Sequence, residues 1–171
     1  MKDFEYLIRD VKDFPKPGIV FKDITPLLFD NKAVECVIDQ FVEQLKGKNI
    51  DKVVGIESRG FLFGMLLAQK LNAGFVPIRK PGKLPHKTIS ESYSLEYGED
   101  ALEIHKDAIK EGEKVLIHDD VLATGGTAQA ACNLIKRLKG DIVAANFLIE
   151  LEFLNGKDKI NDIDVYSIFK Y

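Results

Sequence analysis

The stretch from Val115 to Thr127, which reads Val-Leu-Ile-His-Asp-Asp-Val-Leu-Ala-Thr-Gly-Gly-Thr, decides the fold. Its first three residues, 115–117, are apolar, and their number and β-branching are typical of a buried strand. After Thr127, apolar residues recur at helical spacing up to Gly140, which predicts a helix closed by that glycine. The order strand, short loop, helix is the repeating unit of an α/β fold with a parallel sheet.

Polar groups in the same stretch predict a ligand. Asp119 and Asp120 follow the strand, where their carboxylates can accept hydrogen bonds from sugar hydroxyls. The small-residue loop that comes next offers backbone N–H groups and a helix N-terminus, which together form a phosphate cradle. Its glycines let the backbone approach an oxyanion closely, and its threonines add hydroxyl donors. The combination suits a phosphorylated ribose. The loop consists of Ala123, Thr124, Gly125, Gly126 and Thr127.

Two common nucleotide-binding motifs are excluded, and one simpler interpretation stays open. The sequence has neither a Gly-x-x-x-x-Gly-Lys-Ser/Thr phosphate loop nor a Gly-x-Gly-x-x-Gly fingerprint after a strand. The simpler interpretation is an ordinary glycine-rich turn of an α/β domain, with Asp119 and Asp120 as solvated acids at a strand end.

Length and composition narrow the class of protein. With 171 residues the chain can form one sizeable core, and we expect a single domain over residues 1–171. The net charge of −3 argues against a nucleic-acid or membrane-surface binder, and no apolar stretch approaches the roughly twenty residues of a membrane span. The charged N-terminus predicts no signal peptide. Cys36 and Cys132, which form no Cys-x-x-Cys motif, suit a reduced, cytosolic protein.

The rest of the chain alternates between two kinds of apolar pattern. Helical spacing predicts helices, and short β-branched runs predict buried strands. Strands that alternate with helices imply a parallel sheet covered by helices on both faces, and such sheets bind ligands at the carboxyl ends of their strands. The predicted helices are residues 4–11, 33–45 and 61–71, and the further predicted strands are residues 53–56, 75–78, 142–149 and 165–169.

Residues 79–103 show neither pattern, and the segment is polar with a basic beginning. A stretch this long without regular structure inside a compact domain is more often functional or mobile than structural. We therefore expect residues 79–103 to form a flexible active-site lid with a basic root.

A second loop from a strand into a helix lies at residues 57–60, Glu-Ser-Arg-Gly. Its N–H groups and the Arg59 guanidinium suit an anion, at the same edge of the sheet as the first loop. Arg79, Lys80 and Lys83 follow the next strand and add positive charge, unless they form only a solvated basic loop. Two anion loops predict a ligand that carries phosphate groups at both ends.

The run from Asp119 to Thr127 resembles the signature with which type I phosphoribosyltransferases bind phosphoribosyl pyrophosphate (PRPP). Other segments, which together cover nearly the whole chain in family order, resemble the adenine-specific members of that family. The signature is shared across the family, whereas the first segment and the Tyr-Ser-Leu-Glu-Tyr-Gly sequence within the last one point to adenine. These segments are residues 14–26, 57–61, 78–85 and 92–98.

The resemblance implies the type I fold and a reaction of purine salvage, in which adenine and PRPP give AMP and pyrophosphate. It also implies Mg²⁺ carried by PRPP, because a hard dication matches phosphate and hydroxyl oxygens. The implied protein is a cytoplasmic homodimer with its interface near Arg79. By the same resemblance Asp119 and Asp120 bind the ribose. The pyrophosphate is assigned to Glu57, Ser58, Arg59, Gly60, Arg79, Lys80 and Lys83.

The resemblance also assigns individual residues to catalysis and to recognition of the base. Glu96 matches the family's catalytic glutamate, although a lone loop acid is more often merely solvated, and Tyr97 lies beside it on the lid. Residues 1–30 match the purine-binding segment, in which the backbone of Val20 would pair with adenine.

Two side chains are expected to enclose the base. Phe21 would stack on one face of adenine and Leu151 would cap the other, whereas without the resemblance Val20, Phe21 and Leu151 read as core. Lys22 stands where other members often carry Arg, which keeps the charge but loses the bidentate fork.

Other functions stay open at this point. A 6-oxopurine or orotate phosphoribosyltransferase would share the chemistry, and a regulatory module could bind PRPP without turning it over. Such a sensor needs residues 119–127 but not Arg59, the basic root or Glu96, and it usually has an output region. The chain holds all these chemical parts and no basic helix-turn-helix extension, so we expect an enzyme specific for adenine.

Overall fold

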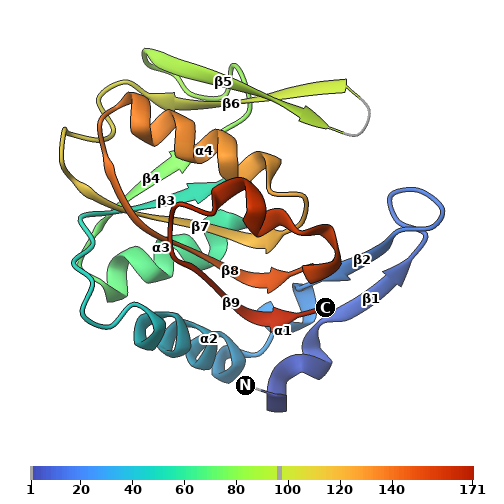
Figure 1. The fold of residues 1–171 in the computed structure, drawn as a ribbon. Coiled ribbons are helices and arrows are strands. Elements are labelled where there is room, and N and C mark those ends of the chain that lie inside the picture. Colours follow the sequence, from blue (N-terminus) through green and yellow to red (C-terminus); the bar gives the residue numbers. More distant parts are fainter. Residues whose placement is uncertain (1, 96–97) are drawn as a thin grey trace. The chain divides into compact units, whose positions relative to one another are not determined.

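The computed structural model describes residues 2–95 and 98–171. The chain divides into two compact units, residues 1–40 and 41–171 (Figure 1). The expectation of a single domain over residues 1–171 stays a prediction.

The first unit contains a short antiparallel hairpin instead of the helix predicted over residues 4–11. A 3-10 helix, η1 (Lys2–Leu7), ends early, and β1 (Arg9–Lys12) pairs with β2 (Val20–Asp23). The prediction was wrong because Val11 has a partner, Phe21, on the far side of the Pro-Gly turn, and local periodicity cannot reveal such a pairing. The short helix α1 (Thr25–Leu28) follows.

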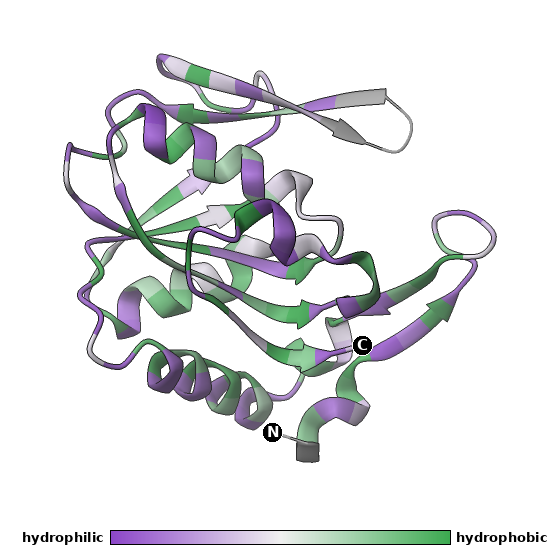
Figure 2. Ribbon diagram, viewed as in Figure 1, coloured by the Kyte–Doolittle hydropathy of each residue, from purple (hydrophilic) through white to green (hydrophobic). Residues whose placement is uncertain are grey.

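Helix α2 (Asn31–Gln44) matches the helix predicted over residues 33–45. Asp30 begins it, because its carboxylate accepts hydrogen bonds from the N–H groups of Lys32 and Ala33. Figure 2 shows hydrophobic and hydrophilic residues alternating along this helix, as an amphipathic helix requires.

The second unit is built on a five-stranded parallel sheet with the strand order β4-β3-β7-β8-β9. The predicted strands are confirmed, and the strand predicted at residues 115–117 extends in both directions. Val54, Ile117 and Phe147, on three strands of the sheet, are at most 1% exposed. The strands are β3 (Lys52–Ile56), β4 (Gly74–Ile78), β7 (Lys114–Leu122), β8 (Asp141–Glu150) and β9 (Val165–Lys170).

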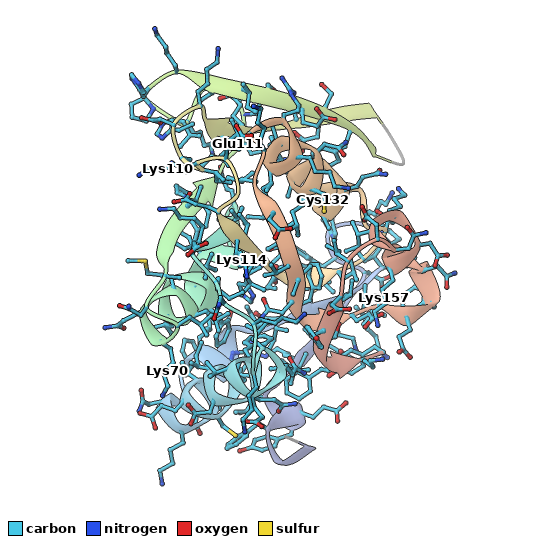
Figure 3. All side chains as sticks on the ribbon, turned by 60° about the vertical axis from the view of Figure 1, so that its left-hand side comes forward. Lys70, Lys110, Glu111, Lys114, Cys132 and Lys157 are labelled. Carbon is cyan, nitrogen blue, oxygen red and sulfur yellow. The ribbon has the colours of Figure 1, made fainter. Side chains whose placement is uncertain are left out.

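Helices cover both faces of this sheet, as predicted. Helix α3 (Gly60–Lys70) lies on one face and α4 (Gly126–Arg137), which carries the buried Cys132, on the other (Figures 1 and 3). The left-handed residue after α4 is Lys139, with φ of 63°, and not the predicted Gly140. The chain leaves β3 in one direction and β7 in the other, so the topological switch point lies between these strands.

The predicted lid contains regular structure. Within it, β5 (Thr88–Leu95) and β6 (Gly98–His105) form an antiparallel hairpin beside α4 (Figure 1). Leu102 and Ile104 alternate inward and are 1% and 0% exposed, so one face of the hairpin joins the core. This period of two is present in the sequence but is carried by few apolar residues among many polar ones.

The last part of the chain before β9 forms two short 3-10 helices. They are η2 (Glu152–Leu154) and η3 (Gly156–Ile160).

Candidate active site

The predicted phosphate cradle is a backbone loop between β7 and α4. Gly125, the residue before the helix, has φ of 77°, a left-handed conformation that glycine adopts without strain. No side chain caps the start of α4, so its first N–H groups stay available to a ligand. Four loop residues line a cavity of about 60 Å³ together with Asp119 and Phe147. Those four are Ala123, Thr124, Gly125 and Thr127.

The two acids lie inside β7 and not beyond its end. β7 continues to Leu122 because the long neighbour β8 pairs with it as far as that residue. Asp119 lines the cavity, whereas Asp120 is 4% exposed and has its Oδ2 2.8 Å from Arg59 Nε. The interpretation as solvated strand-end acids is therefore wrong for Asp120.

Burial governs the protonation of this acid pair. Burial and the neighbouring Asp120 raise the pKa of Asp119 well above its usual value. Burial also raises the pKa of Asp120, although the Arg59 cation opposes that rise. Two carboxylates in such surroundings favour the arrival of a cation or of hydroxyl donors.

The second anion loop, residues 57–60, lies directly beside the acids of β7. A Cβ atom on Gly60 would lie 2.9 Å from both Asp119 Oδ1 and the His118 carbonyl oxygen. Only glycine lets the start of α3 approach β7 so closely. The loop at residues 57–60 and the acids of β7 therefore meet at the switch point of the sheet, where this fold class binds ligands.

Glu57 holds the cations of the predicted pyrophosphate site. Its carboxylate accepts hydrogen bonds from Lys83 Nζ at 2.5 Å, from the Lys80 backbone at 2.8 Å and from Arg79 Nε at 3.2 Å. Burial alone would raise the pKa of Glu57, but these three partners outweigh it and lower the pKa to about 2. Its assignment to pyrophosphate stays a prediction, since here the side chain contacts the cations.

The hairpin supplies residues that sequence reasoning missed. Lys80 forms an ion pair with Asp100 on β6, and the Tyr93 hydroxyl donates to Asp100 Oδ2 at 3.2 Å. Burial raises the pKa of Tyr93 and the nearby Thr127 side chain opposes that rise, so the hairpin lies next to the phosphate cradle. The signal was the alternation of apolar and polar residues along β5.

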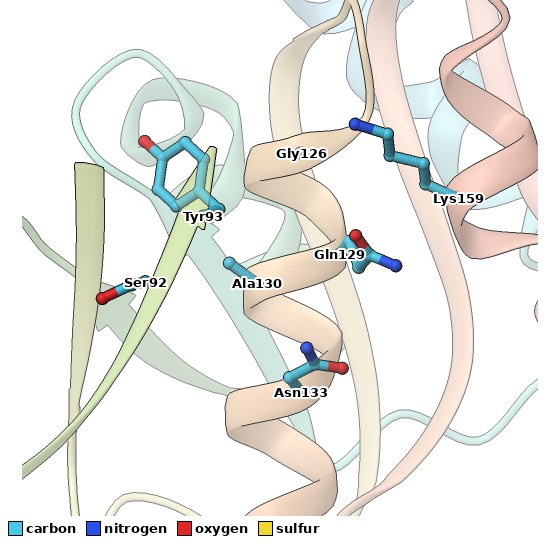
Figure 4. Close-up of a pocket in the computed structure, with 7 residues that line it drawn as sticks. All are labelled: Ser92, Tyr93, Gly126, Gln129, Ala130, Asn133 and Lys159. Atoms are coloured by element: carbon cyan, nitrogen blue, oxygen red, sulfur yellow. The ribbon is translucent and has the colours of Figure 1, made fainter. Parts of the chain in front are cut away.

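A second pocket, of about 250 Å³, lies between β5 and α4 (Figure 4). Tyr93 and Gly126 line it at the end nearer the cradle, and Asn133 and Lys159 are among its polar residues.

The residues assigned to adenine lie in the first unit, except for Leu151. Val20 is 47% exposed at the start of β2, and the Phe21 ring contacts the Phe14 ring edge-on with centroids 5.2 Å apart. Lys22 Nζ is 2.7 Å from Asp10 Oδ1. Leu151 follows β8 in the second unit and is half-buried.

Val20 is exposed, so its interpretation as core is wrong, whereas Phe21 and Leu151 are half-buried. Their roles toward adenine stay predictions. Glu96 and Tyr97, assigned to catalysis and to the lid, lie outside the described residues.

The described part of the chain offers neither a cluster of metal ligands nor a membrane-spanning helix. Residues 2–95 and 98–171 contain no group of three or more His, Cys, Asp or Glu side chains that could hold a metal ion. No helix among them has the length and apolar character to cross a membrane.

Known proteins resemble this chain over its whole length. The family model of the phosphoribosyl transferase domain matches residues 27–169. The adenine phosphoribosyltransferases of Christiangramia forsetii and Flavobacterium johnsoniae are 62% and 61% identical, over 96% and 98% of this chain and equal shares of their own.

Solved structures agree with these relatives. The adenine phosphoribosyltransferase of Thermoanaerobacter pseudethanolicus has a TM-score of 0.97 at 50% identity, over 99% of both chains. That of Saccharomyces cerevisiae, solved with adenine and an imino-altritol bisphosphate, has a TM-score of 0.94 at 41% identity, over 98% of this chain and 97% of its own. The chain therefore belongs to the phosphoribosyltransferase family and, within it, to the adenine phosphoribosyltransferases.

Proposed function

We propose that this chain transfers the phosphoribosyl group of PRPP to adenine and releases AMP and pyrophosphate. A bond forms between a ring nitrogen of adenine and C1 of the ribose, the bond from C1 to pyrophosphate breaks, and the nitrogen loses its proton. The observation that carries this proposal is the position of two anion loops, residues 57–60 and 123–127, after the neighbouring strands β3 and β7 at the switch point. PRPP needs both, because it carries phosphate at one end and pyrophosphate at the other.

The 5′-phosphate belongs in the cradle at residues 123–127. The uncapped N–H groups at the start of α4 and the positive end of its dipole face that loop, and the Thr127 hydroxyl adds a donor. Asp119, on the wall of the same cavity, is placed to accept from the ribose hydroxyls.

The pyrophosphate belongs on the other side of the switch point. Ser58 and Gly60 would offer backbone N–H groups there, and Arg59, Arg79, Lys80 and Lys83 would neutralise the leaving group. Glu57 fixes the positions of Arg79 and Lys83, and Asp100 fixes that of Lys80. Because these carboxylates already hold the cationic side chains in place, the side chains need little rearrangement when negative charge develops on pyrophosphate.

Mg²⁺ is proposed to arrive as part of the substrate. The site suits it, because the Asp119 carboxylate beside Asp120 has its pKa raised, so a cation would relieve the crowded negative charge. When bound, Mg²⁺ would screen the charge of the pyrophosphate. The acids would also stabilise positive charge that develops on the ribose during transfer.

Adenine is proposed to pair with the backbone C=O and N–H of Val20, between Phe21 and Leu151, with Lys22 nearby. Glu96 would handle the proton of the attacking nitrogen, with Tyr97 beside it. The exposure of Val20 supports this role, because an exposed side chain at a strand start leaves the backbone within reach of a ligand.

We also propose a homodimer whose interface includes α3. Leu62, Met65 and Leu66 form an apolar stripe on this helix and are 44%, 58% and 40% exposed. The stripe begins next to Phe61, and the Arg79 guanidinium lies 6.0 Å from the Phe61 ring. Sedimentation of the wild type and of Met65→Lys tests this: the wild type should be a dimer and the variant a weaker one. A cytoplasmic location belongs to the same proposal, since the chain has only two cysteines and no Cys-x-x-Cys motif.

The decisive experiment offers PRPP with adenine, hypoxanthine or guanine and measures nucleotide and pyrophosphate formation. Only adenine should be used efficiently. Efficient use of a 6-oxopurine would favour the related transferase, and PRPP binding without turnover of any base would favour a sensor.

A further inference from the structure

The phosphate loop rests on a distant segment of the chain, which begins at Leu151. The Leu151 N–H donates to the Leu122 carbonyl at 2.9 Å, at the very end of β7. Five residues later the segment meets the loop backbone to backbone: a Cβ atom on Gly156 would lie 2.2 Å from the Ala123 carbonyl oxygen and 3.0 Å from the Gly125 nitrogen. The segment therefore follows the loop from the strand end to the start of α4.

The contact between the two glycines is mutual. A Cβ atom on Gly125 would lie 2.2 Å from the Gly156 carbonyl oxygen, a distance that real Cβ atoms do not adopt. Gly125 needs to be glycine for its left-handed φ as well. Gly156 has no positive φ, so the close approach to the loop is the constraint that the structure places on it.

The support under Gly156 is firm. Asn155, the residue before it, is left-handed with φ of 52°, and η3 begins at Gly156 and ends at Ile160, which is 1% exposed in the core. The next residue, Lys157, forms an ion pair at 2.9 Å with Glu150, which is 5% exposed at the end of β8. The residues before and after Gly156 are thus both fixed, so its backbone cannot easily shift to make room for the loop.

We propose that Gly156 is a positioning residue for the 5′-phosphate of PRPP. It does not line the cavity that the loop encloses, so it acts through the loop by fixing the Ala123 carbonyl and the Gly125 N–H. Hydrogen bonds to phosphate depend steeply on donor position, so a shift of about 1 Å in these groups weakens binding of the phosphate end. This inference rests on the proposed function, since it takes the loop as the phosphate cradle.

The test is Gly156→Ala, in which the added methyl group must displace the loop. We expect the KM for PRPP to rise roughly ten- to one-hundred-fold and the KM for adenine to stay nearly unchanged. Calorimetry with ribose 5-phosphate should show a matching loss of affinity. This second measurement needs no turnover, so it tests the positioning role even if adenine proves not to be the substrate.

The matched control is Gly112→Ala. Gly112 has φ of 80°, and no other atom lies within 4 Å of the position that its methyl group would take, so the substitution strains the backbone without touching the loop. It should lower the Tm and leave the affinity for ribose 5-phosphate unchanged. An unchanged affinity in Gly156→Ala, or a similar loss in both variants, would overturn the proposal.

If Gly156→Ala does not fold, Asn155→Gly decides. Glycine keeps the left-handed conformation but makes the support more flexible. A rise in the KM for PRPP with an unchanged KM for adenine supports the positioning role, and no rise overturns it.

Discussion

The Nε atom of Arg59 lies 2.8 Å from Oδ2 of Asp120, so the start of α3 and the end of β7 are joined by an ion pair at the centre of the site. The Asp120 side chain is 6% exposed and that of Arg59 is 35% exposed. The acid is therefore held in a buried position while the guanidinium reaches water. Asp120 of the predicted ribose site thereby orients Arg59 of the predicted pyrophosphate site.

Asp120→Asn should separate stability from activity. Burial raises the pKa of Asp120, so a neutral amide of the same shape suits the position, and the free energy of unfolding should stay unchanged or increase. Loss of the negative charge near the ribose should lower the single-turnover rate by about 10²-fold. Urea unfolding and rapid-quench kinetics measure the two effects. A clear loss of stability with an unchanged rate would contradict this role.

Thr127→Ala should act on PRPP and not on adenine. In the proposed site the lost hydroxyl would donate a charge-assisted hydrogen bond to the 5′-phosphate, so PRPP affinity should fall about ten- to one-hundred-fold. Titration of PRPP into both proteins checks this. Tyr93→Phe is the control, because it removes a hydroxyl close to Thr127 but no donor to the phosphate, and it should cost much less.

Discrimination between purines should follow hydrogen-bond polarity. Hypoxanthine replaces the 6-amino donor of adenine by an acceptor and protonates the neighbouring ring nitrogen. Both partners on the Val20 backbone would then face like groups, and kcat/KM could differ by about 10⁴. Comparable kcat/KM values for the two bases would exclude the Val20 pairing.

Glu96→Gln should slow the chemical step. The amide keeps the shape of the side chain but cannot exchange the purine proton, so the single-turnover rate should fall about 10²-fold or more. PRPP affinity should change little, because the anion loops proposed to bind PRPP are residues 57–60 and 123–127. Ser92→Ala, on β5, is the control. A near-wild-type single-turnover rate in the Gln variant would leave Glu96 without a catalytic role.

The sequence predicted those parts of the fold that local patterns determine. β3, α3 and β4 lie where the spacing of apolar residues predicted them, because residues that are buried together in such an element are close in sequence. β1 was missed because its partner lies beyond a turn. Asp119 and Asp120 were placed outside β7 because the length of that strand is set by its neighbour β8.

The candidate site was predicted to a similar extent. The loop at residues 123–127 was correctly placed between a strand and a helix, since its small residues are contiguous, and its role toward phosphate stays a prediction. The cation-holding role of Glu57 was missed because Arg79 and Lys83 are more than twenty positions away in sequence. The contact of Gly156 with the loop could not be predicted for the same reason. Residues that are far apart in sequence and meet only in the folded chain leave no local sequence pattern.

The buried ring of His118 should make the free energy of unfolding depend on pH. Its ring is fully buried, with Nδ1 2.8 Å from Asn146 Oδ1, and burial outweighs this hydrogen bond and lowers the pKa to about 4. An unfolded histidine titrates near 6.5, so between these values only the unfolded chain binds the proton. The free energy of unfolding should therefore fall as the pH drops from about 6.5 to 4, by about 3 kcal/mol from this group.

His118→Gln removes the titrating group and should flatten this pH dependence. Urea unfolding at several pH values between 7.5 and 4.5, for the wild type and the variant, measures it. Only the difference between the two proteins reports on His118, because the raised pKa of Asp119 changes stability in the opposite direction over part of the range. His86→Gln, a matched change at an exposed ring, is the control. If the stability difference between wild type and His118→Gln does not change with pH, the buried ring is not the source of the acid sensitivity.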